Sequence, residues 1–328
     1  MFRALIAEKN DQDVHVHVTQ LDDQDLPEGD VVIDVEYSTI NYKDGLAVTN
    51  KVPVMRSWPM IPGIDLAGRV AESNRDDIPV GLPVVINGWG LGETHWGGFS
   101  QRARVNGDWT VPIPETFDPR QAMAIGTAGF TAMLCLIALK ENHVLPDSGP
   151  IVVTGASGGV GSIAVSLLSE AGYRVHASTG RPEEDSYLTA LGASTVIHRK
   201  ELAEASNRKL ARIRWAGAID CAGSHTLANV LASVAPEGCV VSCGNAQGMD
   251  LPTTVAPFIL RGVTLRGIHS VTVPRPLRIK VWDQLAVNLN VEHLASMTQT
   301  VGLGEALETC HSILAGQVRG RVVLDVNK

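Results

Sequence analysis

The chain has 328 residues, of which 45% are hydrophobic, and this is enough for about two domains with separate cores. Its net charge of −8 is mild, and the sequence contains no basic cluster of the kind that binds nucleic acid. The first residues lack the apolar core of a signal peptide, and no uninterrupted apolar run reaches the ~18–20 residues of a membrane helix. We therefore expect a cytoplasmic protein that binds neither nucleic acid nor a membrane.

The five cysteines are odd in number and form no disulfide-like framework, which favours a reducing compartment. Cys239 and Cys243 lie in the apolar run GCVVSCG. We expect both to be packed thiols, because a free cysteine behaves as a small hydrophobic side chain.

Residues 1–122 are rich in strand patterns. The segment DVVIDVEYSTI (30–40) alternates and contains many β-branched residues, which predicts a strand. Glycine and proline punctuate this whole region, as in PMIPGIDLAG and PVGLPVVINGWG. Many short strands separated by turns predict a barrel-like or sandwich-like domain.

The pattern changes after Pro119. A long helical candidate at 122–141 is followed by alternating strand and helix patterns, which predict a doubly wound parallel sheet. A helix at 276–290 and a last strand, RGRVVLDV, follow, and this strand is more similar to the N-terminal region. We therefore predict an α/β protein with a β-rich domain over 1–122, a dinucleotide-binding domain over 123–270, and a C-terminal segment over 271–328 that returns to the first domain.

The stretch IVVTGASGGVGSIAVSLL (151–168) reads as a strand, a glycine-rich turn and a helix. Apolar residues from Val160 onward recur at helical spacing, and Gly172 can end the helix. Free N–H groups at the start of such a helix bind a pyrophosphate, and glycines let it approach. In the G-x-G-x-x-G frame the first glycine is replaced by Ala156, so an ordinary strand–helix turn is the alternative. The predicted contacts are Ser157, Gly158, Gly159 and Val160.

A second frame, made by Gly155, Gly159 and Gly161, fits the glycine pattern of short-chain dehydrogenases. Those enzymes need a catalytic Tyr-x-x-x-Lys, and none of the four tyrosines here has a lysine four residues later. We therefore set this frame aside.

The end of the next strand points to NADPH as the coenzyme. An NAD site usually has a carboxylate there to bind the ribose 2′-hydroxyl, but this strand ends without one. Arg181 can pair with a 2′-phosphate, and Arg199 is a second candidate partner. Residues 183–185 are acidic, and we expect them on the solvated start of a helix. The predicted contacts in this region are Ser178, Thr179, Gly180, Arg181 and Arg199.

The order of these regions resembles the medium-chain dehydrogenase/reductase superfamily. The segments INYKDG (40–45), PGIDLAG (62–68), GTAGFTAM (126–133) and GRVVLDV (320–326) resemble its quinone oxidoreductase branch. Longer stretches, among them GWGLGETHWGG, WAGAIDCAG and LPTTVAPFILRGVTLRGI, resemble the acrylyl-CoA reductase (YhdH-type) group. The resemblance covers nearly the whole chain and implies a Rossmann-type sheet inserted in a GroES-like catalytic domain, a homodimer, and an acyl-CoA substrate.

The resemblance also implies that no catalytic zinc is bound. Zinc-dependent relatives have an early cysteine, a His-Glu pair in the segment that matches PGIDLAG, and a later cysteine. Here the corresponding positions hold Asn41 and Tyr42, then Ile64 and Asp65, and no cysteine precedes Cys135. Since a catalytic zinc needs about three protein ligands, we expect no metal.

Reduction of an activated C=C bond without zinc requires hydrogen-bond donors for the enolate and a proton for the α-carbon. Tyr42 is the leading candidate for this role, and Asn41 is a candidate for orienting the substrate or the nicotinamide. The resemblance places Tyr42, Thr127 and Thr131 near the nicotinamide. Asn245 and Ser270 follow strands of the sheet, at the edge where coenzymes bind. The predicted function is an NADPH-dependent, zinc-independent enoyl reductase, with a quinone oxidoreductase and a non-catalytic NADPH-binding protein as alternatives.

Overall fold

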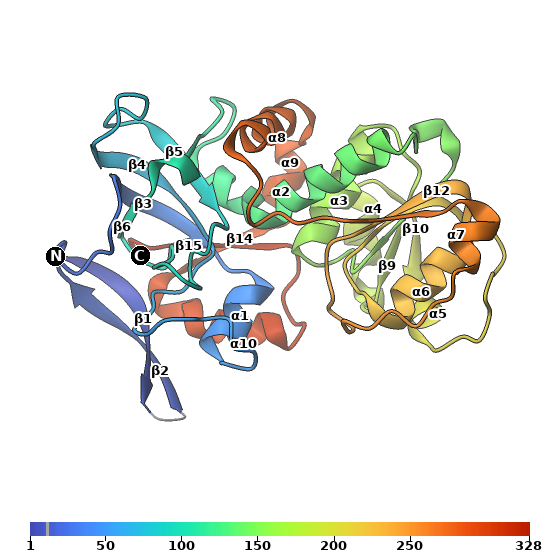
Figure 1. Cartoon of the computed structure of the whole chain (residues 1–328), viewed down its shortest axis with the longest axis horizontal. Helices are drawn as coiled ribbons and strands as arrows, with labels where there is room; N and C mark the ends of the chain where they lie inside the picture. Colours follow the sequence, from blue (N-terminus) through green and yellow to red (C-terminus); the bar gives the residue numbers. More distant parts are fainter. Residues whose placement is uncertain (11–12) are drawn as a thin grey trace. The chain divides into compact units, whose positions relative to one another are not determined.

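A computed structural model describes residues 1–10 and 13–328, and its chain forms two compact units. Unit 1 comprises Met1–Thr127, Ser270–Ala286 and Leu294–Lys328, and unit 2 comprises Ala128–His269 and Val287–His293. Figure 1 follows the chain through its helices and strands in sequence colours.

Unit 1 is built on a seven-stranded sheet with the order β14-β15-β3-β4-β5-β7, in which β6 also pairs with β3. The C-terminal strand β15 runs antiparallel to β3, with Leu324 opposite Ser38. Because β15 lies in the same sheet as the N-terminal strands, its residue pattern is similar to theirs. The remaining strands, β1 and β2, form a hairpin. The strand bounds are β1 (Phe2–Asn10), β2 (Asp13–Leu21), β3 (Val31–Thr39), β4 (Asp65–Ser73), β5 (Pro83–Asn87), β6 (Arg102–Val105), β7 (Val111–Pro112), β14 (Thr298–Gly302) and β15 (Arg321–Asp325).

The core of unit 1 collects apolar side chains from this sheet, from the hairpin and from the loop before β6. Ile33, Leu66 and Leu324 of the sheet and Phe99 of the loop are all fully buried. Helices α1 and α10 pack closely at Gly45. A Cβ at this position would lie 3.0 Å from the carbonyl oxygen of Cys310, so a larger residue would not fit without a shift. The helices at the two ends of the chain are α1 (Tyr42–Val48), α8 (Arg275–Asn288), α9 (Val291–Ser296) and α10 (Ala306–Leu314), and two short 3₁₀ turns cover Gly107–Trp109 and Leu303–Glu305.

Unit 2 contains a six-stranded parallel sheet with the order β10-β9-β8-β11-β12-β13. Strands β8 and β11 lie in the middle and are buried along their whole length, as expected of strands covered on both faces. Strand β13 is at the edge and is mostly exposed. The bounds are β8 (Ile151–Thr154), β9 (Val175–Thr179), β10 (Ala193–His198), β11 (Trp215–Asp220), β12 (Val234–Ser242) and β13 (Thr264–Gly267).

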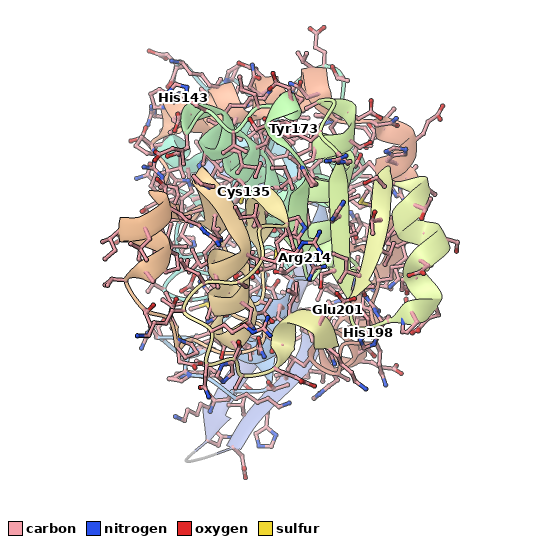
Figure 2. All side chains as sticks on the ribbon, turned by 90° about the vertical axis from the view of Figure 1, so that its right-hand side faces the viewer. Cys135, His143, Tyr173, His198, Glu201 and Arg214 are labelled. Carbon is pink, nitrogen blue, oxygen red and sulfur yellow. The ribbon has the colours of Figure 1, made fainter. Side chains whose placement is uncertain are left out.

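The helices of unit 2 follow the strands in alternation, which confirms the predicted doubly wound α/β fold (Figure 1). The sheet and helices share a core that contains Trp215, Val230 and Val240. Figure 2 shows Arg214 beside Glu201, and these side chains form an exposed ion pair of 3.2 Å. The helix bounds are α3 (Gly159–Glu170), α4 (Asp185–Ala190), α5 (Lys200–Ala203), α6 (Ser224–Ser233) and α7 (Ala256–Arg261), with 3₁₀ turns at Pro146–Ser148 and Pro182–Glu184.

Helix α2 (Pro119–Glu141) contains the boundary between the two units. It is interrupted at Gly126, whose φ of 50° and ψ of −160° are not helical. The helix is long and apolar enough to cross a membrane, but 83% of its most apolar window is buried inside the protein. This burial is typical of a core helix.

Candidate functional site

The glycine-rich turn of unit 2 connects β8 to α3 and folds back onto the start of the helix. Gly155 has a positive φ of 62°, and its carbonyl oxygen accepts a hydrogen bond from the N–H of Gly158 at 3.0 Å. A Cβ on Gly161 would lie 2.3 Å from the same oxygen, so only glycine lets the helix begin this close to the strand. Gly158 is the N-cap residue of α3 and has no side chain to cap the first N–H groups. The start of this helix therefore suits an anion.

Polar groups at the end of β9 lie over this turn. The hydroxyl oxygens of Ser157 and Thr179 are 3.0 Å apart, and Arg181 Nη2 donates to Ser157 Oγ at 2.9 Å and to its carbonyl oxygen at 3.1 Å. The N–H of Arg199 donates to the carbonyl oxygen of Thr179 at 2.7 Å. A Cβ on Gly180 would lie 2.5 Å from Nε of Arg199, so the Arg199 side chain lies against this glycine. Arg181 and Arg199 therefore both lie near Gly180, beside the glycine-rich turn.

Two neighbours hold this arrangement in place. Ser178 is buried, and its carbonyl oxygen accepts the N–H of Ala156 at 3.0 Å, which ties β9 to the turn. Glu184 was expected on a solvated helix start, but it is buried and its Oε1 lies 3.9 Å from Nη1 of Arg181. That expectation is wrong for Glu184, because the short 3₁₀ turn after Arg181 directs its carboxylate back toward the guanidinium.

The other residues proposed for the coenzyme in unit 2 lie on α2, at the start of α3 and at the end of β12. Thr131 is buried in α2, whereas Gly159 and Val160 are half-buried in the first turn of α3. Asn245 is exposed and lines a hollow of about 530 Å³ at the carboxyl ends of β12 and β13.

Sequence reasoning missed Asp220, which is fully buried at the end of β11. Its Oδ1 accepts from the hydroxyl of Thr154 at 2.7 Å, and its Oδ2 accepts from the N–H of Gly223 at 2.8 Å. Burial raises the pKa of this carboxyl. The available signal was a carboxylate at the end of an otherwise apolar strand pattern.

The polar centre of unit 1 is the carboxylate of Asp65, the fully buried first residue of β4. Asn41 Nδ2 donates to it at 2.8 Å and Asn87 Nδ2 at 2.7 Å. Thr127 donates twice, from its N–H at 3.0 Å and from its hydroxyl at 2.5 Å. We call Asp65, Asn41, Asn87 and Thr127 the Asp65 cluster. No local pattern in the sequence indicates that these four residues meet.

Asn41 is held at both ends of its amide. Its side-chain Oδ1 accepts a hydrogen bond from Arg321 Nη1 at 3.2 Å, and its Nδ2 donates to Asp65 as described above. In addition, its backbone N–H donates to Asp44 Oδ2 at 2.8 Å. Burial raises the pKa of Asp44 to about 7 and lowers that of Arg321 to about 10. Arg321 also donates to the hydroxyl of Thr39 at 2.8 Å. These contacts position the start of α1, where Asn41 is the N-cap residue.

Tyr42 is the first residue of α1, and its side chain is 46% exposed. The next residue, Lys43, forms an ion pair with Glu93. Ser270 also belongs to unit 1, and its carbonyl oxygen accepts from Arg278 Nη2 at 3.1 Å. The structure therefore brings Asn41 and Thr127 together through Asp65, and it places Tyr42 directly after Asn41.

The donor set around Asp65 does not fit a zinc ion. Both carboxylate oxygens of Asp65 accept hydrogen bonds from neighbouring side chains and backbone. Across the described ranges, 1–10 and 13–328, no group of three or more His, Cys, Asp or Glu side chains is arranged to hold a metal. Asn41 occupies the position next to this carboxylate, and an amide nitrogen that donates to it is not a metal ligand.

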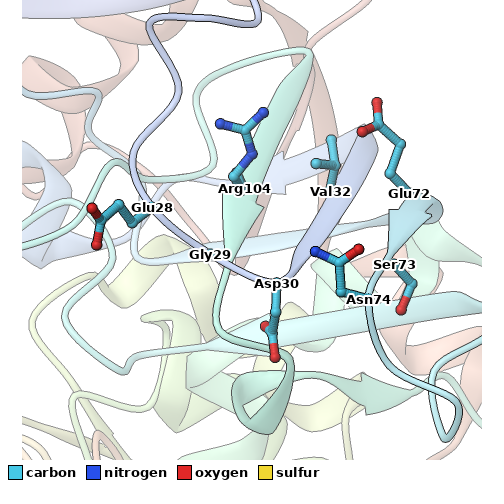
Figure 3. Close-up of a pocket in the computed structure, with 8 residues that line it drawn as sticks. All are labelled: Glu28, Gly29, Asp30, Val32, Glu72, Ser73, Asn74 and Arg104. Atoms are coloured by element: carbon cyan, nitrogen blue, oxygen red, sulfur yellow. The ribbon is translucent and has the colours of Figure 1, made fainter.

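A second hollow, of about 430 Å³, lies in unit 1 at the edge formed by β3, β4 and β6 (Figure 3). Glu28, Asp30 and Glu72 line it together with Arg104. None of the residues predicted for the coenzyme or the reaction lines this hollow. Its carboxylates would repel the phosphates of a dinucleotide or of coenzyme A, so we do not regard it as the site of the reaction.

Comparison with known proteins agrees with this geometry. Residues 27–115 match the family model described as alcohol dehydrogenase GroES-like domain, and residues 159–288 match the model described as zinc-binding dehydrogenase. The chain is 49% identical to a probable acrylyl-CoA reductase, AcuI, of Escherichia coli (strain K12), over 99% of this chain and 100% of that protein. It is 47% identical to the acrylyl-CoA reductase AcuI of Ruegeria pomeroyi, over 100% of both chains.

Solved structures give the same picture. The yhdH oxidoreductase of Salmonella enterica, in complex with NADP, superposes with a TM-score of 0.97 at 46% identity, covering 99% of this chain and 100% of that one. The yhfP protein of Bacillus subtilis, with NAD bound, superposes with a TM-score of 0.95 at 43% identity, covering 99% of each chain. The first of these structures contains NADP, which has a 2′-phosphate, and the second contains NAD, which lacks it.

Proposed function

Because the chain belongs to the medium-chain dehydrogenase/reductase superfamily, in its acrylyl-CoA reductase group, we propose that it is an NADPH-dependent, zinc-independent enoyl reductase. Its substrate is a short α,β-unsaturated acyl-CoA, and acrylyl-CoA is reduced to propionyl-CoA. The observation that carries the proposal is the pair of guanidinium groups of Arg181 and Arg199 beside the glycine turn. The same family supports a second candidate, a quinone oxidoreductase, since a Bacillus subtilis relative with 43% identity is called a putative quinone oxidoreductase.

In this proposal the glycine turn binds the pyrophosphate of NADPH. Gly158 and Gly159 leave room for the phosphates at the first N–H groups of α3, and Ser157 is held close to them by Arg181. Arg181 and Arg199 then pair with the 2′-phosphate, because a guanidinium matches a phosphate with two parallel hydrogen bonds. Neither Ser178 nor Thr179 is acidic, so the end of β9 has no carboxylate to repel this phosphate.

When bound, NADPH would supply a hydride for the β-carbon of the conjugated thioester, and negative charge would then develop on the thioester carbonyl oxygen. Hydrogen-bond donors must stabilise this charge, and a proton must reach the α-carbon. We assign the donor role to the phenol of Tyr42, because its side chain is exposed at the start of a helix that the Asp65 cluster positions. Asn41 acts as a positioning residue, since its amide oxygen and nitrogen are engaged by Arg321 and Asp65.

The decisive test compares substrates at equal enzyme concentration. NADPH oxidation is followed at saturating NADPH with acrylyl-CoA and, separately, with a benzoquinone. We expect acrylyl-CoA to be turned over much faster and to yield propionyl-CoA. Faster turnover of the quinone would instead identify a quinone oxidoreductase, and binding of NADPH without reduction of either compound would identify a non-catalytic binding protein.

We also propose that the protein is a cytoplasmic homodimer. All five cysteines are free thiols, as in proteins of reducing compartments. Strand β13 is an edge strand with a largely exposed surface. The adjoining helix α7 exposes Ile259 and Leu260, and its N-cap residue Val255 is also exposed. An unpaired edge next to exposed apolar side chains suits pairing with a second copy about a two-fold axis.

A further inference from the structure

Three of the five cysteines meet in unit 2. Cys221 follows β11 and Cys243 follows β12, and these parallel strands place Asp220 opposite Ser242, so the two cysteines are neighbours across the sheet. Their Sγ atoms are 3.8 Å apart. The thiol of Cys135, on α2, also forms a hydrogen bond with Cys243, and Figure 2 labels Cys135 in unit 2. Cys135 is fully buried, whereas Cys221 and Cys243 are half-buried.

Cys243 differs from its two neighbours because it lines the hollow at the carboxyl ends of β12 and β13. Asn245, Ile268 and His269 line the same hollow. This is the edge at which open parallel sheets bind their ligands. A small molecule that enters the hollow therefore lies next to Cys243.

The surroundings of Cys243 favour a reactive sulfur. Hydrogen bonds from the thiols of Cys135 and Cys221 hold the pKa of Cys243 well below that of an ordinary cysteine, while the pKa values of both donors are raised. As a thiol, Cys243 donates to the carbonyl oxygen of Asp220 at 3.5 Å. The Asp220 carboxyl interacts with Cys243, and His269 lines the hollow as a further titratable group. The thiolate is the nucleophilic form of cysteine, so Cys243 is the most reactive of the three.

We propose that Cys243 is a covalent modification site for small α,β-unsaturated carbonyl compounds. The sulfur of Cys243 forms a bond to the β-carbon, the C=C π bond breaks, and its electron pair moves to the carbonyl as an enolate. The α-carbon then takes a proton from water, which replaces the one that the thiol released. The addition changes no oxidation state, so it needs no coenzyme and no oxidant. That acrylyl-CoA is one natural member of this class rests on the proposed function.

The experiment uses the full-length protein without NADPH and two electrophiles, acrylamide and acrylyl-CoA. The adducts are located by peptide mass spectrometry over time. We expect Cys243 to be alkylated at least about tenfold faster than Cys239 and Cys310, because burial raises the pKa of both of these thiols. Acrylamide contains no coenzyme A, so its result is independent of the enzyme's substrate. Alkylation by acrylamide at Cys243 together with no reduction of acrylyl-CoA by NADPH would refute the proposed function alone.

Variants of the neighbouring thiol test the cause. Cys221→Ala removes a hydrogen-bond donor and should slow the alkylation of Cys243, whereas Cys221→Ser retains a donor and should restore most of the rate. Cys239→Ala is the matched control, since Cys239 is buried on the same strand and should not affect the rate. Equal rates at all cysteines, preferential alkylation of Cys221, or an unchanged rate in Cys221→Ala would each overturn the proposal.

Discussion

Asp65 occupies the segment in which zinc-dependent relatives have metal ligands, yet here it accepts hydrogen bonds from Asn41, Asn87 and Thr127. A buried carboxylate is costly unless it is well hydrogen-bonded, and four donated hydrogen bonds offset this cost. Because Asn41 is one of these donors, the hydrogen bonds also position the residue that follows it, Tyr42. Its backbone is held by the neighbouring cap while its ring stays exposed.

The assignment of Tyr42 as donor predicts the effect of removing one oxygen atom. Tyr42→Phe should lower kcat for acrylyl-CoA by about 100-fold, since general acid catalysis contributes roughly 10²–10⁴-fold. The affinity for NADPH, measured by fluorescence titration, should not change. Tyr37→Phe makes the same chemical change on β3 and should keep full activity. An unchanged kcat in Tyr42→Phe would remove Tyr42 from the mechanism.

Gly180 offers a test of coenzyme selectivity that leaves every charge in place. In Gly180→Ala the new Cβ would lie 2.5 Å from Nε of Arg199, and this flexible side chain must move away. We expect the Kd for NADPH to rise by about tenfold, the equivalent of one charge-assisted hydrogen bond, while the Kd for NADH stays the same.

The double variant identifies the cause of that loss. Because Gly180→Ala acts by displacing Arg199, combining it with Arg199→Ala should weaken NADPH binding no further than Arg199→Ala does alone. Additive losses would contradict the contact between Gly180 and Arg199. A loss of NADH affinity of the same size would show that neither residue contacts the 2′-phosphate.

At the scale of one element, α2 owes its interruption to Gly126. Its φ of 50° and ψ of −160° lie in a region that is essentially restricted to glycine. The break lets the N–H of Thr127 point at Asp65 instead of continuing the helix. The sequence predicts one long helix here because its apolar pattern is continuous, and the pattern does not record a backbone angle.

Replacing this glycine tests the interruption. A Cβ on Gly126 would lie 2.8 Å from Cγ2 of Thr39 and 2.9 Å from Nη2 of Arg321. We therefore expect Gly126→Ala to lower the free energy of unfolding by about 2–4 kcal/mol, from backbone strain and overpacking together. Gly304→Ala, where a Cβ meets no atom within 4 Å, should change it by less than about 0.5 kcal/mol. Urea denaturation measures both, and equal stabilities would argue against the strained geometry.

At the scale of the whole molecule, the proposed dimer depends on the exposed edge of the unit 2 sheet. Ile259 is 72% exposed on α7, and a charge there would be buried without a partner in a dimer formed through this edge. Ile259→Glu should therefore give a monomer in light scattering coupled to gel filtration. Val80→Glu changes a similarly exposed apolar residue of unit 1, 66% exposed, and should leave the dimer intact. A wild-type monomer, or a dimeric Ile259→Glu, would exclude this interface.

Local patterns were sufficient to predict the α/β fold, the parallel sheet and the glycine turn. They were sufficient because strand period, helix period and the need for glycine are properties of adjacent residues. The lack of an acidic residue at the end of β9 could likewise be read directly and pointed to NADPH. The return of the last strand to the first domain was also visible, because RGRVVLDV has the alternation of the N-terminal strands.

The contacts that join these elements into a site could not be predicted from local sequence patterns. Asn41 meets Asp65 24 positions later and Arg321 280 positions later, and Cys221 meets Cys243 across 22 positions. Such partners are chosen by the register of paired strands and by the angle at which a helix starts. Register and helix angle both follow from the packing of the whole core. The tertiary structure therefore decided the hydrogen bonds of Asp65, the contact between Gly180 and Arg199, and the meeting of Cys135, Cys221 and Cys243.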